Sequence, residues 1–174
     1  MVDGVIDFSH LPDDGVYVIG KKGTVALSIQ KTNQTISDPV NFLFNPKSIP
    51  GSIRDYTLTV KNSGSGKPDA ETTVIRDILP AELTLYTGDL NGSGSPFVFT
   101  DNSCPPETDT SMSNLTLDYP ADVVFKDGSG AVVSSVSEYD HSVRSFEITL
   151  SGIMNASSAG QVPCFTIRYR TQLD

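Results

Sequence analysis

Strict alternation of apolar and polar side chains is the sequence feature that most constrains how this chain folds. Within residues 54–61 the apolar side chains are Tyr56, Leu58 and Val60, and each is flanked by polar residues. The runs SFEITL and CFTIRYR nearer the C-terminus repeat this two-residue period. A period of two places one face of a β-strand on a core and the other in water. Each run therefore predicts a half-buried strand.

Turn-forming residues separate these runs and favour a domain built from many short strands. The 174 residues include 14 glycines and 11 prolines, many of which fall between short apolar segments. Regular turn signals of this kind are typical of an all-β antiparallel sandwich. Further short strands are expected at residues 83–86, 96–100, 114–117, 122–125 and 131–136, and a hairpin is expected where 16–19 and 24–29 flank 20–23.

Residues 68–79 are open to two interpretations. Ala70, Val74 and Ile78 recur with the four-residue spacing of one helix face. The second half of the segment is also a β-rich run, which ends at Leu79 and Pro80. The pattern alone does not decide between helix and strand.

The formal net charge of −9 is concentrated in the middle of the chain. Residues 77–143 hold eleven acidic side chains and a single basic one, Lys126. We expect this charge to repel nucleic acid and anionic membrane surfaces. We also expect no membrane-spanning segment and no signal peptide, because a long apolar run and a basic leader are both missing. The acidic segment is either a solvated surface or a cation-binding region.

Residues 45–88 combine Pro50 with Gly51, a strand centred on Tyr56, an Asn-Ser-Gly loop at 62–64, and Asp77 ahead of Leu79 and Pro80. In these elements the segment resembles a bacterial conserved-repeat family catalogued as domain of unknown function 11. The similarity extends more loosely over residues 24–174, which would form a single module. Residues 1–23 are then an irregular lead-in or the start of a hairpin.

Membership of this family would imply an immunoglobulin-like antiparallel β-sandwich without catalytic residues. Such modules are strung in tandem along bacterial secreted or cell-surface proteins, so the implied location is extracellular and the implied partners are neighbouring modules. The resemblance also favours a strand within residues 68–79. The side chains expected to face inward are Tyr56, Leu58, Val60, Val74, Phe146, Ile148, Leu150, Phe165, Ile167 and Tyr169.

Two features of the resembling segment have a physical interpretation. Asp77 precedes a proline corner, where a short acidic side chain can accept hydrogen bonds from nearby backbone N–H groups. The loop at 62–66 is rich in residues that tolerate positive φ. Both features would shape the fold, and neither needs a substrate.

No combination of residues predicts catalysis or a zinc site. The two cysteines lie 60 residues apart and the only histidines are His10 and His141, whereas zinc sites draw on closely spaced ligand pairs. The Gly-Ser-Gly triplets lack the spacing of a nucleophile elbow. Because the chain has no tryptophan, carbohydrate stacking would depend on Tyr86, Tyr119 and Tyr139.

A calcium site is one interpretation of the acidic segment. Residues 89–94, DLNGSG, place oxygen-bearing side chains at positions 1, 3 and 5 and glycine at position 6, as an EF-hand loop does. Position 12 is Thr100 rather than glutamate, which excludes a true EF-hand. A looser calcium site would use Asp89, Asn91, Asp101 and Asp109. The alternative is an ordinary glycine-rich hairpin loop.

The exported location implied by the resemblance predicts a disulfide between Cys104 and Cys164, because oxidising compartments favour paired cysteines. Cys164 alternates with Phe165 and should therefore face away from the core, within reach of a loop. Two separate thiols are the alternative.

Together these features predict a non-catalytic structural or spacer module of a bacterial secreted or cell-surface protein. The alternative is an adhesin-type binding module, stabilised by calcium, that uses the acidic loops of residues 77–143. An exposed apolar patch would favour a partner site, which a pure spacer lacks. Neither prediction involves nucleic acid or direct membrane insertion, and the sequence identifies no ligand.

Overall fold

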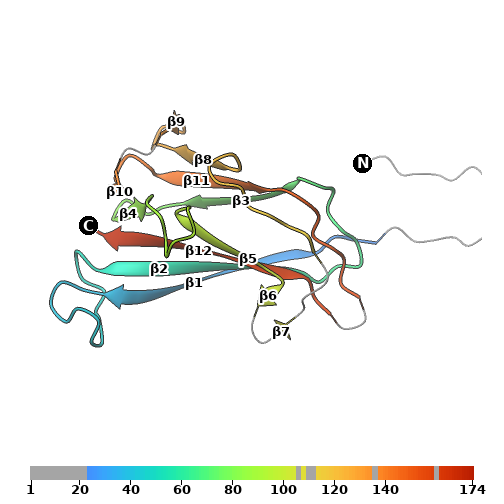
Figure 1. Cartoon of the computed structure of the whole chain (residues 1–174), viewed down its shortest axis with the longest axis horizontal. Helices are drawn as coiled ribbons and strands as arrows, with labels where there is room; N and C mark the ends of the chain where they lie inside the picture. The colour runs from blue at the N-terminus through green and yellow to red at the C-terminus, as the bar shows by residue number, and fades with distance from the viewer. Residues whose placement is uncertain (1–22, 105–106, 109–112, 135–136, 159–160) are drawn as a thin grey trace, which may run out of the picture.

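The computed structural model describes residues 23–104, 107–108, 113–134, 137–158 and 161–174. Within these residues the chain forms strands and turns and no helix. Two antiparallel sheets pack face to face, which confirms the predicted β-sandwich (Figure 1). The ambiguous segment contains strand β3 (Thr73–Ile78), so its helical interpretation is wrong.

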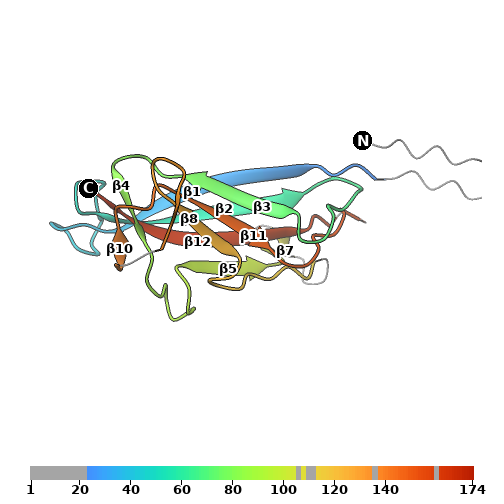
Figure 2. The ribbon, with the colours of Figure 1, turned by 90° about the horizontal axis from the view of Figure 1, so that it is seen from above.

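The larger sheet is organised around two long central strands, β2 and β12. Its strands, in spatial order, are β1 (Leu27–Ser37), β2 (Ile53–Asn62), β12 (Cys164–Leu173), β4 (Leu83–Tyr86) and β10 (Tyr139–Asp140), and β5 (Phe97–Asp101) also pairs with β12. Both β1 and β12 pair with β2 in the antiparallel sense, so they run in the same direction. The start of β1 and the end of β12 therefore lie at opposite ends of the sandwich (Figures 1 and 2). We call these the proximal and the distal end.

The smaller sheet covers one face of the larger one and leaves β3 at its edge. Its strands, in spatial order, are β3, β11 (Ser145–Leu150), β8 (Val123–Lys126) and β9 (Val132–Val133). A separate two-stranded ribbon consists of β6 (Ser103–Cys104) and β7 (Glu107–Thr108). Edge strands β1 and β3 lie on the same side of the sandwich, one from each sheet (Figure 2).

Most of the short strands lie where the sequence predicts them. The strand at 83–86 has the expected bounds, and those at 96–100 and 122–125 are shifted by one residue. No strand forms at 114–117, where Ser113 and Thr116 make only isolated bridges. The run at 131–136 gives the two-residue β9, and 135–136 lie outside the described residues.

Only the second strand of the hairpin expected around 20–23 lies within the described residues. Residues 16–19 lie outside the described part of the chain. The run at 24–29 enters β1, which begins at Leu27 and pairs with β2 over its length.

The predicted core is confirmed except at Val74. The other nine side chains expected to face inward are buried, whereas Val74 is 53% exposed. In β3 the buried residues are Thr73 and Ile75, and Ile75 lies opposite the buried Ile148 of β11. The apolar residues with helical spacing, Val74 and Ile78, are thus on the outer face of an edge strand.

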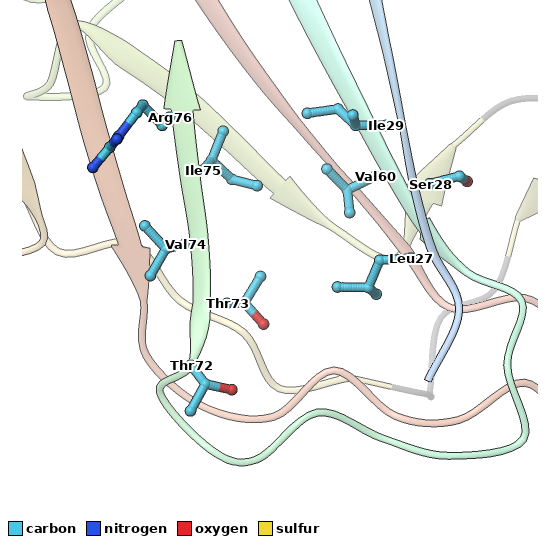
Figure 3. Close-up of a pocket in the computed structure, with 9 residues that line it drawn as sticks. All are labelled: Leu27, Ser28, Ile29, Val60, Thr72, Thr73, Val74, Ile75 and Arg76. Carbon is cyan, nitrogen blue, oxygen red and sulfur yellow. The ribbon is translucent and has the colours of Figure 1, made fainter. Parts of the chain in front are cut away.

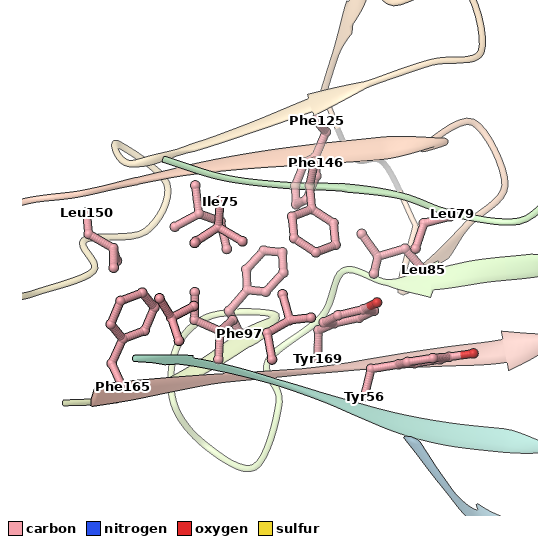
Figure 4. Packing of buried hydrophobic residues seen from close by; sticks show 14 of the residues in the cluster. Tyr56, Ile75, Leu79, Leu85, Phe97, Phe125, Phe146, Leu150, Phe165 and Tyr169 are labelled. Atoms are coloured by element: carbon pink, nitrogen blue, oxygen red, sulfur yellow. The ribbon is translucent and has the colours of Figure 1, made fainter. Parts of the chain in front are cut away.

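Aromatic side chains from three strands meet at the centre of the core (Figure 4). The ring centroid of Phe97 lies 4.9 Å from that of Phe146, and Phe146 lies 5.0 Å from Tyr169 in an edge-to-face arrangement. Phe146 belongs to the smaller sheet, while the other two rings come from the larger one. Since large buried aromatic rings contribute much of a core's stability, this cluster ties the two sheets together.

Asp77 also joins the two sheets, on the side where the edge strands β1 and β3 lie. Its carboxylate accepts a hydrogen bond from the Tyr169 hydroxyl at 2.5 Å and pairs with Lys31 Nζ at 2.7 Å. The Lys31 ammonium also lies 4.8 Å from the centroid of the Tyr56 ring, and burial together with the nearby carboxylate raises the pKa of Tyr169. The partners of Asp77 are thus side chains of other strands rather than the nearby backbone groups that the sequence predicted.

The loop at 62–66 is fixed by hydrogen bonding and close packing rather than by positive φ. None of its residues has a positive φ, although several of them tolerate one. The buried Asn62 side chain accepts from Ala26 N and Gly64 N and donates to Gly66 O and Asn155 O. A Cβ on Gly64 would lie 2.1 Å from the Thr24 carbonyl oxygen. Glycine is required there because another stretch of backbone passes so close.

Candidate functional site

Four large apolar side chains are exposed on the loop that connects β1 to β2. We call residues 38–48 the apolar loop. Phe44 is 87% exposed, Leu43 77% and Phe42 71%, and Val40 is also exposed. Single exposed apolar residues are ordinary on a protein surface, but a contiguous group is typical of an interaction site. This loop is the strongest candidate for a contact surface among the described residues.

The buried carboxylate of Asp38 holds the apolar loop in one shape. Its Oδ1 accepts from the backbone N–H groups of Val40 at 2.7 Å and Asn41 at 2.6 Å. Its Oδ2 accepts from Lys47 N at 2.5 Å, across the loop. The backbone groups of Asp38 and Phe42 also bond to one another in both directions. The apolar side chains are thus displayed by an internally braced loop.

Acid should release this loop when the Asp38 carboxylate becomes protonated. The backbone N–H of Asn41 is the main cause that lowers the pKa of Asp38 to about 2, from an ordinary value of 3.8. A lowered pKa means that the stabilising bonds are fully present above about pH 4 and are lost as the pH falls through about 2. Amide NMR shifts of Val40, Asn41 and Lys47 should titrate together near pH 2. A midpoint near 4, or no common titration, would contradict the role of Asp38. In Asp38→Asn the shared titration should vanish.

The apolar loop lies at the distal end, beside the last strand. Gly51 N donates to Leu173 O at 2.7 Å, and Leu173 N donates to Ser52 O at 2.9 Å. Gly51 has φ +82°, in the left-handed region that favours glycine, and it turns the chain into β2. The residues that follow the loop are therefore bonded to the end of β12.

A second apolar surface is a groove between the edge strands β1 and β3, which we call the β1–β3 groove (Figure 3). It has a volume of about 350 Å³, and Leu27, Ile29, Val60 and Ile75 point into it. Leu27 and Ile29 belong to the inward-facing series of β1, yet they are 48% and 58% exposed. No described strand of the smaller sheet covers them, because that sheet ends at β3.

Two of the residues predicted for calcium, Asp89 and Asp101, accept hydrogen bonds from backbone N–H groups. Asp89 Oδ1 accepts from Gly94 N at 2.8 Å, and Asn91 takes a left-handed φ of 59° in the same turn. Asp101 accepts from Leu115 N and Asn102 N, and burial is the main cause that raises its pKa. Asp109 lies outside the described residues. Among those that are described, no three His, Cys, Asp or Glu side chains form a metal-binding group.

Several other acidic side chains of residues 77–143 brace turns in the same way. Asp127 Oδ1 accepts from Ser129 N and Ala131 N, and the Ser129 hydroxyl is the main cause that lowers its pKa. Asp122 accepts from Asp118 N at 2.7 Å. Much of the acidic charge thus serves local turns.

Of the two cysteines predicted to pair, the structure describes the side chain of Cys164 alone. Cys164 is fully buried and is not one of the residues of the main hydrophobic cluster. Strand β6, which ends at Cys104, lies beside β12, and Asn102 N donates to Cys164 O at 2.8 Å. The Cys104 side chain is outside the described atoms, so the disulfide stays a prediction.

One group of polar side chains resembles a catalytic set, but its hydroxyl is buried. Thr84 Oγ1 lies 2.7 Å from His141 Nδ1 and donates to Asp174 Oδ1 at 2.7 Å. Thr84 is fully buried, so its hydroxyl offers no accessible nucleophile.

Of the tyrosines considered for carbohydrate stacking, two come together. Tyr86 and Tyr139 meet edge to face at 5.1 Å. Tyr119 packs against the core instead. The pair does not form a flat stacking platform, because the two rings are inclined at 66°.

Sequence reasoning missed both apolar surfaces. One available signal was the run VNFLF at 40–44, which is apolar at four of five positions and lacks the alternation of a half-buried strand. The β1–β3 groove has no such signal, since its exposure depends on where the opposite sheet ends.

Comparison with known proteins identifies no relative: no family model, no curated protein and no solved structure matches this chain. The resemblance in residues 45–88 therefore stays a hypothesis. Among the described residues, no helix is both long enough and apolar enough to cross a membrane.

Proposed function

We propose that this protein is a non-catalytic structural module that links and spaces neighbouring domains of a bacterial secreted or cell-surface protein. The observation that supports this role best is topological. The chain enters β1 at the proximal end and leaves β12 at the distal end, and both strands are bonded along their lengths to β2. Domains attached before and after such a module are held apart by its long axis.

The apolar loop is a patch that a pure spacer would lack, and it supports an added contact with a partner at the distal end. It is braced by Asp38, and Gly51 and Ser52, which follow it, are bonded to Leu173 of β12, so the loop lies at the distal end. Aromatic and leucine side chains presented on a rigid support contribute strongly to interfaces, because little conformational entropy is lost when they bind.

The adhesin alternative gains less support from the contacts of the acidic residues. Asp89, Asp101 and Asp127 each bind backbone N–H groups of their own turns. Those bonds explain their positions without a cation. The location at the cell surface and the immunoglobulin-like family rest on the resemblance in residues 45–88.

Scattering from a chain with two copies in series tests the spacer role. Two full-length copies should have a maximum dimension at least about 35 Å greater than that of one copy, because the 11 residues of β1 span about 36 Å. The comparison should use the Phe44→Asp variant as well, so that adhesion through the apolar loop does not decide the result. A two-copy chain that is wider but no longer than one copy would contradict the proposal.

A further inference from the structure

Two apolar surfaces stay uncovered in the described part of the chain, and their shapes are opposite. The apolar loop is convex, since Phe42, Leu43 and Phe44 each expose more than two thirds of their surface. The β1–β3 groove is concave and apolar along Leu27, Ile29 and Ile75 (Figure 3). A protruding apolar group and an apolar groove on one chain are complementary in both shape and chemistry.

The two surfaces lie too far apart to meet within one copy. The groove is at the proximal end, where β1 begins at Leu27 and β3 begins at Thr73. The apolar loop begins after Ser37, eight residues along β1 from the groove residue Ile29, so about 27 Å of strand separates the two. The loop of one copy can therefore reach only the groove of another.

We propose that Phe42, Leu43 and Phe44 of one copy insert into the β1–β3 groove of a second copy. The contact joins different surfaces of the two copies, so it is heterologous and runs head to tail. Because each copy carries both a loop and a groove, the contact can repeat from copy to copy until a free loop meets a free groove. This contact goes beyond the spacer role and does not depend on it.

Rigidity and charge support this occupant of the groove. Because Asp38 braces the apolar loop before binding, little order has to be gained on contact. The exposed Lys47 belongs to the apolar loop, while the exposed Lys67, Asp69 and Glu71, which together carry one net negative charge, precede the groove residue Thr72. Opposite charges at the rim would orient the two copies. Arg76, also at the rim, is already paired with Glu147.

The contact is small, so it should be weak and depend on concentration. Interfaces at the lower end of the size range are transient, and the net charge of −9 opposes association of copies at low salt. Sedimentation velocity of the full chain in 0.3 M salt, up to high micromolar concentration, should show a mass that rises steadily. A chain that remains monomeric over this range overturns the proposal.

Variants that remove one surface at a time test the head-to-tail arrangement. Phe44→Asp places a charge on the apolar loop, and Ile29→Asp places a charge in the β1–β3 groove. Each variant alone should therefore be monomeric. Val132→Asp is the matched control, because Val132 is 72% exposed and lies in β9, away from both surfaces. It should associate like the unaltered chain, and its failure to do so would overturn the proposal. Melting curves should confirm that all three variants fold.

Mixing the two defective variants gives the decisive result. The mixture still contains one intact groove and one intact loop, so it should form a complex of one copy of each and nothing larger. A mixture that stays monomeric overturns the proposal. Association of Ile29→Asp alone would also overturn it, because the loops would then be binding one another. Failure here leaves the two-copy scattering result unaffected, so the two proposals are tested separately.

Discussion

Replacing Phe146 by alanine should lower the free energy of unfolding by about 4 kcal/mol. Phe146 is fully buried, and its ring contacts those of Phe97 and Tyr169 from the opposite sheet. Removing it leaves a cavity at the point where the sheets meet, which the β-sheet backbone can only partly close. Urea denaturation followed by far-UV circular dichroism measures the loss.

Val74→Ala is the matched control for this experiment. Its side chain points outward from edge strand β3, so the variant should differ from the unaltered chain by less than about 0.5 kcal/mol. A large effect at Val74 together with a small one at Phe146 would show that the register of β3 and the assignment of the core are wrong.

Reducing a Cys104–Cys164 disulfide should lower the free energy of unfolding by about 4 kcal/mol in the chain-entropy model, because the bond closes a loop of about 60 residues. The neighbouring positions of β6 and β12 support this pairing. Urea denaturation with and without dithiothreitol measures the loss, and a Cys104→Ser variant should be insensitive to the reductant. Two free thiols per chain on unreduced, denatured protein would contradict the prediction.

The strands that the sequence predicted best are those buried on one face only. In β2, β11 and β12 every second residue enters the core, so the two-residue period is visible in the sequence itself. Strand β3 was ambiguous because it lies at a sheet edge, where Val74 and Ile78 stay exposed. An apolar residue on the outer face of an edge strand breaks the pattern that the prediction uses.

The candidate site was less predictable because it depends on what the rest of the molecule leaves uncovered. Leu27 and Ile29 follow the inward alternation of β1, and only the end of the smaller sheet at β3 exposes them. The shape of the apolar loop depends on a bond between Asp38 and Lys47, nine residues apart. Local patterns carry no information about contacts of this kind.

The spacer role can be tested most directly by pulling single molecules in two directions. Force applied between Met1 and Asp174 acts along β1 and β12 in opposite directions. This force shears the β1–β2 and β2–β12 ladders. Because the hydrogen bonds of these ladders lie across the strands, many of them bear the load at the same time. Force applied between position 47 and Asp174, both at the distal end, opens the β2–β12 ladder one pair at a time.

If the module is built to hold domains apart under tension, the end-to-end direction should need a clearly higher unfolding force than the distal-end direction at the same pulling rate. Equal forces, or a lower force from end to end, would contradict the account.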